Sequence, residues 1–226
     1  MFANVINLFF PEVCAGCDAH LLTGESIICT NCRHQLPLTN HHLIPDNEAY
    51  QKFYGKLPVE FVATLCYFPE KGIVREMIHK LKYKGQEAIG AAFGLWFGEE
   101  LKRIPSTRDI DAIVPVPLHK KRLHERGYNQ VSSFGKALSE SLEIPYDENT
   151  LVRNIYSKSQ TRKNRSGRSL NNQSVFGVTN NENPDGKHFL LIDDVLTTGA
   201  TLEACGRALL KIPNVKISIA CIAMTK

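Results

Sequence analysis

The sequence predicts an α/β fold, in which a parallel sheet is flanked by helices and a small cysteine-bearing module precedes it. Residues 188–204 run from a short apolar segment through two aspartates into a Thr-Gly turn and a helical pattern, which is the order of a strand and its following helix. A second apolar segment, DAIVPV at 111–116, leads into a basic loop. Two Cys-x2-Cys pairs stand near the amino terminus.

Length and composition fit one sizeable core with an appendage. The chain has 226 residues, of which 43% are hydrophobic and 22% charged, as in globular proteins. The net charge of +4 is mild, so the local distribution of charge matters more than the total. No apolar run is long enough to span a membrane, and no basic region precedes the first one. We therefore expect an unexported, cytoplasmic protein without a membrane span.

Three parts are expected along the chain. Residues 1–36 form an N-terminal helix and the cysteine module, residues 37–59 a proline-punctuated linker, and residues 60–226 the α/β domain. The first helix is interpreted as a cover for the cysteine module. A membrane or partner anchor is the alternative, although an amphipathic anchor normally carries Lys or Arg and this segment has neither.

The cysteine pairs have the spacing of a zinc ribbon. The candidate ligands are Cys14, Cys17, Cys29 and Cys32, and three histidines lie close enough to compete, His34, His41 and His42. Four thiolates suit the tetrahedral preference of structural Zn²⁺, whereas disulfides are disfavoured in the cytoplasm. Redox chemistry or fortuitous spacing is the alternative. Residues 14–32 contain no Lys or Arg, which favours a structural or protein-contacting ribbon over a nucleic-acid contact.

Periodicity assigns the next elements. We expect a strand at 61–68, helices at 73–84 and 86–103, and DAIVPV as the first strand of the parallel sheet. Trp96, Cys66, Cys205 and Cys221 are interpreted as core residues. A helix follows Gly127, a short strand is expected at 175–179, and 215–223 supplies a last strand.

Two basic segments are candidates for binding an anion. The loop after DAIVPV carries Lys120, Lys121, Arg122, Arg126 and Gly127, and pyrophosphate is its expected occupant. A solvated charged loop without a ligand is the alternative. Residues 151–177 are rich in cations and polar residues. Within them Arg162, Lys163 and Arg165 are predicted to form a flexible lid over a leaving group. A nucleic-acid-binding arm is the alternative for this segment.

The turn after the apolar run at 189–192 has the chemistry of a sugar-phosphate site. Backbone N–H groups at a helix start favour an anion, and Gly199 permits close approach. Asp193 and Asp194 can accept hydrogen bonds from vicinal hydroxyls or face a hard cation. Neither a P-loop nor a Gly-x-Gly-x-x-Gly after a strand is present. The predicted binding residues are Asp193, Asp194, Val195, Leu196, Thr197, Thr198, Gly199, Ala200 and Thr201.

Taken in order, the Cys-x2-Cys pairs, YGKLP, CYFPEKGIVREMIHKLKYKG, VPVPL, RGYNQ and LLIDDVLTTGAT resemble the ComF family of the type I phosphoribosyltransferase superfamily. The resemblance covers essentially the whole chain. It implies an N-terminal zinc ribbon, a core related to amidophosphoribosyltransferases, and a part in competence and DNA uptake.

The resemblance also implies a ligand, phosphoribosyl pyrophosphate (PRPP), bound with Mg²⁺. Asp193 and Asp194 would be the catalytic pair, and phosphoribose would pass to an acceptor, such as an amine or a base. The alternative is a non-catalytic module in natural transformation that binds single-stranded DNA or a helicase-like partner.

Overall fold

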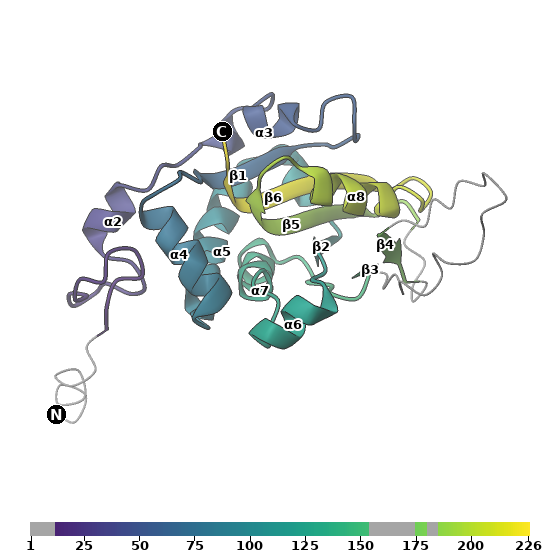
Figure 1. Ribbon diagram of the computed structural model, residues 1–226. Helices are drawn as coiled ribbons and strands as arrows, with labels where there is room; N and C mark the ends of the chain where they lie inside the picture. Colours follow the sequence, from purple (N-terminus) through teal and green to yellow (C-terminus); the bar gives the residue numbers. More distant parts are fainter. Residues whose placement is uncertain (1–11, 154–174, 180–184) are drawn as a thin grey trace.

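A computed structural model describes residues 12–153, 175–179 and 185–226. Its centre is a four-stranded sheet with the order β1-β6-β5-β2, and all neighbouring strands are parallel (Figure 1). The strands are β1 (Val62–Tyr67), β2 (Ala112–Pro115), β5 (His188–Leu196) and β6 (Lys216–Met224). The predicted parallel α/β sheet is confirmed, and its four carboxyl ends share one edge.

The position predicted for DAIVPV is wrong, because β1 precedes it in the same sheet. β2 instead lies at the margin, paired with β5 on one side. On the other side, among the described residues, Ile113 makes an isolated bridge to Tyr146. Pro115 ends β2, which suits a residue that cannot donate to a ladder.

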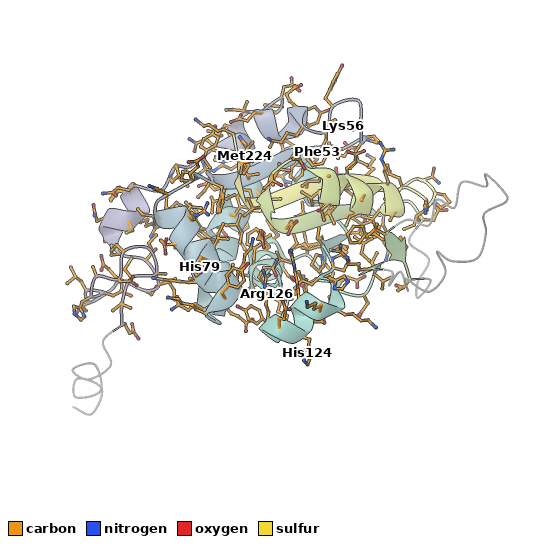
Figure 2. All side chains as sticks on the ribbon, viewed as in Figure 1. Phe53, Lys56, His79, His124, Arg126 and Met224 are labelled. Carbon is orange, nitrogen blue, oxygen red and sulfur yellow. The ribbon has the colours of Figure 1, made fainter. Side chains whose placement is uncertain are left out.

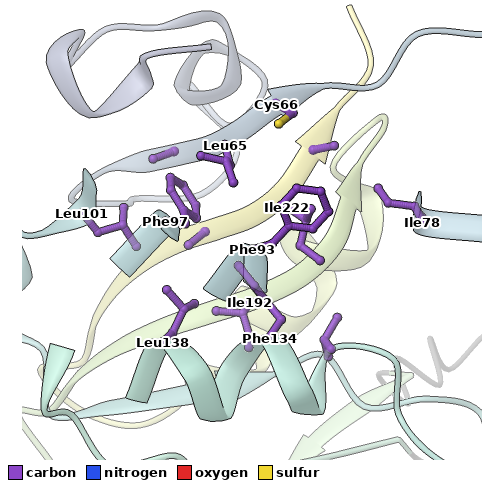
Figure 3. Close-up of a cluster of buried hydrophobic side chains, with 14 of the residues drawn as sticks. Leu65, Cys66, Ile78, Phe93, Phe97, Leu101, Phe134, Leu138, Ile192 and Ile222 are labelled. Atoms are coloured by element: carbon purple, nitrogen blue, oxygen red, sulfur yellow. The ribbon is translucent and has the colours of Figure 1, made fainter. Parts of the chain in front are cut away.

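Helices cover both faces of the sheet (Figure 1). One face carries α4 (Ile73–Tyr83), α5 (Glu87–Leu101) and α7 (Ser132–Leu142), and the other carries α3 (Glu48–Gln51) and α8 (Ala200–Leu209). Side chains of β5 alternate between the two cores: Leu190 and Ile192 lie in one, Phe189 and Leu191 in the other. Figure 3 shows the first core, where the aromatic rings of α5 and α7 meet the sheet. A strand buried on both faces explains its continuous apolar run.

A stripe of glycines lets α5 and α7 approach closely. A Cβ at Gly94 would lie 2.5 Å from the carbonyl oxygen of Phe134 and 2.6 Å from Cβ of Ala137. Gly90 and Gly98 face Ser133 and Ser141 of α7 in the same way. The two helices therefore form one close-packed layer on this face of the sheet.

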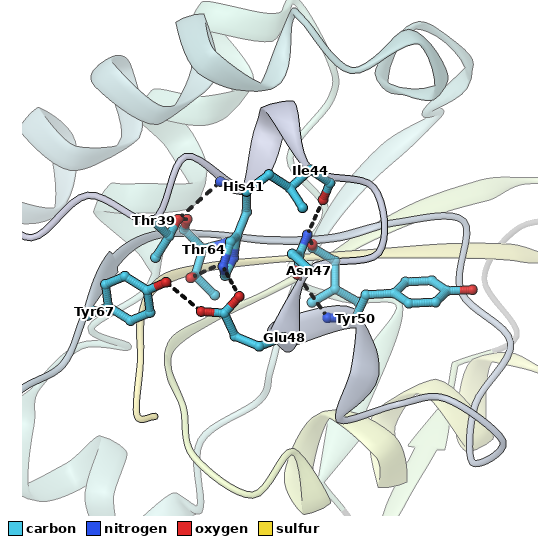
Figure 4. A network of polar contacts seen from close by, with 9 residues as sticks. Thr39, His41, Ile44, Asn47, Glu48, Tyr50, Thr64 and Tyr67 are labelled. Atoms are coloured by element: carbon cyan, nitrogen blue, oxygen red, sulfur yellow. Dashed lines mark hydrogen bonds and ion pairs between the residues drawn. The ribbon is translucent and has the colours of Figure 1, made fainter.

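The segment 37–59, expected as a linker, is packed on the sheet. It contains a 3₁₀ turn, η1 (His41–Leu43), as well as α3. Asn47 caps α3 by accepting the N–H of Tyr50 at 3.0 Å and donates to the carbonyl of Val62 at 2.9 Å (Figure 4). Its neighbours Ala49, Phe53 and Leu57 belong to the second core. The domain boundaries themselves remain a prediction.

A buried histidine ties this segment to β1 (Figure 4). Nδ1 of His41 lies 3.3 Å from the backbone nitrogen of Thr64, and its Nε2 lies 3.3 Å from Glu48 Oε2. The hydroxyl of Tyr67 donates to the other oxygen of Glu48 at 2.5 Å. Burial lowers the pKa of His41, which favours the neutral ring.

Shorter elements complete the described chain. They are α2 (Thr30–His34), η2 (Pro105–Asp109), α6 (Lys120–Arg126), and the antiparallel pair β3 (Leu151–Arg153) and β4 (Phe176–Val178). Among the described residues, no helix combines the length and the apolar character needed to cross a membrane.

Candidate functional site

The predicted phosphate turn lies at the carboxyl edge of the sheet. β5 continues to Leu196, so both aspartates belong to the strand rather than following it. The chain then reverses at Gly199, which has φ +81° and precedes the first residue of α8. Thr197, Thr198 and Thr201 are exposed. The N–H of Ala200 donates to the Thr198 hydroxyl at 3.4 Å. The exposed threonines and the first turn of α8 thus lie at the same edge, and a helix start of this kind suits an anion.

The ring of Phe53 packs against this turn. Gly199 is buried, and a Cβ there would lie 3.1 Å from Cζ of the Phe53 ring. About two turns further along α8, a Cβ at Gly206 would lie 2.4 Å from Cδ2 of Leu57. The segment 53–57 therefore lies directly against α8 (Figure 2). Sequence reasoning missed this support, because an aromatic residue in a proline-bounded segment gives no local sign of its distant partner.

Asp194 is held by two residues outside the predicted set. Lys82 Nζ, in the last turn of α4, lies 2.8 Å from Oδ1 of Asp194. The side-chain amide of Gln130, just before α7, donates to Oδ2 at 2.6 Å. Asp194 is only 5% exposed, so a charged carboxylate at this depth requires such partners.

Asp193 has a different environment. Successive side chains of a strand leave opposite faces, so the two carboxylates start from opposite sides of β5. Asp193 Oδ1 accepts the backbone N–H of Asp194 at 2.8 Å. Burial and the neighbouring Asp194 carboxylate raise the pKa of Asp193 to about 7. The acidic pair therefore consists of Asp194, which is bonded to a lysine, and Asp193, which holds its proton more tightly than an ordinary aspartate.

The basic segment after β2 is a helix, where a loop was expected. α6 begins after His119, whose Nδ1 accepts the N–H of Lys121 at 3.2 Å, and it ends at Gly127 with φ +77°. All its cations are exposed except Arg126, which is half-buried. Because β2 and β5 are parallel neighbours, α6 and the turn before α8 leave the same edge of the sheet.

A cavity of about 250 Å³ lies between α6 and the end of α4. Its lining consists of Lys82, Tyr83, Gly85, Arg122, Glu125, Arg126 and Tyr128. The guanidinium of Arg126, labelled in Figure 2, lies 5.0 Å from the centroid of the Tyr83 ring and donates to Oε1 of Gln130 at 2.5 Å. Gln130 thus joins Arg126 to Asp194. Lys120 and Lys121 do not line this cavity.

Two predicted features lie outside the described residues: the N-terminal helix before Pro11 and the three cations of the expected lid. These cations are Arg162, Lys163 and Arg165.

The four cysteines of the N-terminal module come together as predicted. Their Sγ atoms all lie within 4.8 Å of one another. Cys17 and Cys29 are 3.8 Å apart, which matches the sulfur separation of about 3.8 Å that follows from tetrahedral Zn–S bonds of about 2.3 Å. Two of the three competing histidines have other partners, since His41 is bound to Thr64 and Glu48 and His42 lies 2.8 Å from Glu100. His34 is not among the residues whose ligand atoms gather in the cluster. The cluster can therefore hold a metal ion with sulfur ligands alone.

Backbone groups prepare one of these thiols. The N–H groups of Gly16 and Cys29 donate to Sγ of Cys14 at 3.3 and 3.2 Å. Although burial acts in the opposite direction, N–H groups of Cys29, Gly16 and Cys17 lower the pKa of Cys14 to about 7. A thiol that releases its proton near neutral pH is a ready metal ligand.

α4 anchors the cysteine module to the α/β core. The ammonium of Lys80, in a residue only 5% exposed, donates to the carbonyl of Ala15 at 3.0 Å and to Asp18 at 2.6 Å. The side-chain hydrogen bond and charge of Lys80 lower the pKa of Asp18. Gly16 lies against Ile73 at the other end of the helix.

The remaining cysteines are core residues, as expected. Cys66, Cys205 and Cys221 are buried and unpaired. Burial raises the pKa of all three thiols, to about 12 for Cys66. Trp96 is only partly buried at the edge of the first core, where the Arg33 guanidinium lies 4.9 Å from its ring centroid.

Comparison with known proteins adds to this geometry. The family model described as phosphoribosyl transferase domain matches residues 132–226. Competence protein ComFC of Bacillus subtilis (strain 168) is 28% identical over 88% of this chain and 78% of its own length. DNA utilization protein YhgH of Escherichia coli (strain K12) is 28% identical over 94% of this chain and 90% of its own length. Competence protein F of Haemophilus influenzae is 26% identical over 93% of this chain and 96% of its own length.

A crystal structure of adenine phosphoribosyltransferase is also similar, with 15% identity, 66% of this chain and 75% of that chain covered, and a TM-score of 0.38. That likeness carries no weight beside the strand order and the family match. The matches over most of the chain confirm the resemblance to the ComF family. Residues 132–226 thus match the phosphoribosyl transferase domain, a zinc-ribbon-like cysteine cluster precedes them, and the chain is similar over most of its length to the competence proteins ComFC and F and to the DNA utilization protein YhgH.

Proposed function

We propose that this protein binds PRPP with Mg²⁺ at the edge formed by the carboxyl ends of β5 and β2, and transfers its phosphoribosyl group to an acceptor. One observation carries the proposal: exposed donors at the start of α8 adjoin an acidic pair, and a basic helix leaves the same edge. A sugar that carries anions at both ends and hydroxyls between them fits this order of charges.

Each group of residues would bind one part of the ligand. The first turn of α8, with Thr197, Thr198 and Thr201, would hold the 5-phosphate through N–H and hydroxyl donors. Asp193 and Asp194 would accept hydrogen bonds from the ribose hydroxyls. Cations of α6 would face the diphosphate, and bound Mg²⁺ would supply further positive charge there.

The reaction itself needs placement and charge rather than a protein nucleophile. The bond between C1 of ribose and a diphosphate oxygen breaks, the electron pair leaves with the diphosphate, and the acceptor's lone pair forms the new bond to C1. Positive charge develops on the ribose, so carboxylates beside it and cations beside the leaving group both stabilise the transition state. Closure by Arg162, Lys163 and Arg165 over the leaving group remains a prediction.

We also propose that Cys14, Cys17, Cys29 and Cys32 hold a structural Zn²⁺. The support is the all-sulfur donor set, with Sγ atoms within 4.8 Å of one another. A closed site of four thiolates has no open position for catalysis. Its expected contribution is folding free energy, about 10 kcal/mol or more for a module too small to form its own core.

Calorimetric titration of the zinc-loaded chain with PRPP, with and without Mg²⁺, tests the assignment. We expect Mg²⁺-dependent binding that Asp194→Asn weakens more than tenfold, since hydrogen bonds to a charged group contribute about 1.5–3 kcal/mol. Asp185→Asn is the control, because Asp185 is an exposed carboxylate whose partner is Asn214. Equal PRPP affinity of Asp194→Asn and wild type would remove the aspartate from the site.

A second function, binding of single-stranded DNA, is favoured by the exposed cations of α6 and by the names of the relatives. The same titration with a single-stranded oligonucleotide at several salt concentrations tests it. DNA affinity that falls steeply with salt, together with no PRPP binding, would favour a non-catalytic role in transformation. Lys120→Ala with Lys121→Ala should then reduce the salt dependence.

A further inference from the structure

We infer that Lys82 is a substrate-binding residue of this site: it holds Asp194 in the free protein and provides a cation for the diphosphate of PRPP. Lys82 belongs to α4, far along the chain from the two segments that the sequence assigns to the ligand. The inference rests on the proposed function and adds a residue to its anion-binding part.

The ammonium of Lys82 borders two environments. On one side it meets Oδ1 of Asp194 at 2.8 Å, and the side chain of Asp194 is 7% exposed. On the other side Lys82 lines the cavity between α4 and α6, and its own side chain is 22% exposed. The lysine therefore forms the wall between the buried carboxylate and the open cavity.

The cavity has the charge of an anion site. Three cations line it, Lys82, Arg122 and Arg126, against one carboxylate. The side chain of that carboxylate, Glu125, is 57% exposed, and its Oε1 lies 3.9 Å from Nζ of Lys121. The negative charge of Glu125 is therefore partly balanced by a cation outside the cavity lining. Three cations at one small cavity suit a diphosphate, which accepts hydrogen bonds from several directions at once.

Asp194 organises two of these cations. Oδ1 holds Lys82 directly, while Oδ2 accepts from Gln130, whose own carbonyl oxygen holds Arg126. Each carboxylate oxygen has further lone pairs, so the ribose hydroxyls can bind without displacing either partner. An ion pair serving stability alone would not require its lysine to share a cavity with two arginines. The geometry thus links the ribose end of the ligand to its diphosphate end through one carboxylate.

Three ligands separate the role of Lys82 from general damage to the site. Calorimetry of the full, zinc-loaded chain with Mg²⁺ would use PRPP, inorganic pyrophosphate and ribose 5-phosphate, for wild type and Lys82→Met. We expect Lys82→Met to weaken PRPP and pyrophosphate roughly 10- to 100-fold, the loss expected for one charged hydrogen bond, and ribose 5-phosphate less than about twofold.

Two further variants serve as controls. Lys84→Met makes the same charge change two residues away, at an exposed position that does not line the cavity, and should leave all three affinities unchanged. Lys82→Arg keeps the charge and should retain most PRPP affinity, which also shows that the position tolerates substitution.

The outcomes are distinct. PRPP affinity within twofold of wild type in Lys82→Met overturns the inference and leaves the proposed function in place. Equal losses for PRPP and ribose 5-phosphate also overturn it, because Lys82 would then act only by holding Asp194. If wild type binds neither sugar phosphate, the proposed function fails, and this inference falls with it.

Discussion

Replacing Gly199 by alanine should destabilise the turn proposed to bind phosphate, for two separate reasons. The backbone at Gly199 has φ +81°, a left-handed conformation that costs an L-residue about 1–2 kcal/mol. The new Cβ would also lie 3.1 Å from Cζ and 3.2 Å from Cε1 of Phe53, which is 1% exposed and has little room to move. Overpacking of this kind costs about 1–3 kcal/mol. Gly199→Ala should therefore lower the free energy of unfolding by about 2–5 kcal/mol.

Gly186 provides a matched control. It has φ +75°, and nothing lies within 4 Å of the position of its Cβ. Gly186→Ala thus pays the backbone cost alone. Urea denaturation of both variants, followed by circular dichroism, measures the difference, which should be about 1–3 kcal/mol. Phe53→Leu in the Gly199→Ala background should recover part of the loss, because the smaller side chain removes the contact.

The reasoning is refuted if Gly199→Ala is no less stable than Gly186→Ala, because the Phe53 contact would then have no energetic consequence. It also fails if Phe53→Leu adds its own cost in full to that of Gly199→Ala, since the two residues would then be independent.

Three further predictions concern the core, the acidic pair and the metal. Gly94→Ala should lower the free energy of unfolding, measured by urea denaturation, by about 1–3 kcal/mol, because its Cβ would meet backbone atoms of α7. This loss should outweigh the better helix propensity of alanine. Gly90→Ala should lower the free energy of unfolding less, since the closest atom there is the movable hydroxyl of Ser133. Burial raises the pKa of Asp193 from 3.8 to about 7 in the folded protein, so from about pH 4 to about pH 7 the folded state keeps a proton that the unfolded chain releases. The free energy of unfolding should therefore fall as pH rises through this window. The urea midpoint of the wild type should fall with it, whereas the midpoint of Asp193→Asn should not show this fall. Removal of zinc by a chelator, or Cys32→Ser, should unfold the ribbon and leave the parallel sheet intact, as followed by metal content and amide hydrogen exchange.

The main elements of the fold could be predicted from periodicity. The apolar run at 189–192 and the helical spacing after Gly199 have one plausible arrangement, and β5 and α8 are found there. α6 was missed because a seven-residue segment dense in cations has no apolar face. It forms with a cap from His119 and an exposed pair between Lys121 and Glu125, both weak and local.

In the candidate site, too, the residues of one local motif could be predicted, whereas their partners from distant parts of the chain could not. Residues 193–201 share one motif, and their chemistry could be predicted because strand, turn and helix are continuous. Gln130 and Asp194, by contrast, lie 64 residues apart, and their hydrogen bond exists only because α7 packs beside β5. Phe53 reaches Gly199 across an even longer stretch of chain. Partners of this kind are products of tertiary packing, and a single sequence carries no local signal for them.

Helix α4 gives the cysteine cluster and the proposed sugar-phosphate site a common frame. Lys80 and Lys82 stand in its last turn, about 200° apart around the axis at 100° per residue, one bonded to the ribbon at Ala15 and the other to Asp194. The order of this one turn therefore affects the contacts of both lysines. Thermodynamic reciprocity then requires that, if metal occupancy strengthens ligand binding, the ligand strengthens metal retention by the same factor. With such coupling, a ligand bound at Asp194 would reduce the loss of metal from the cysteine cluster.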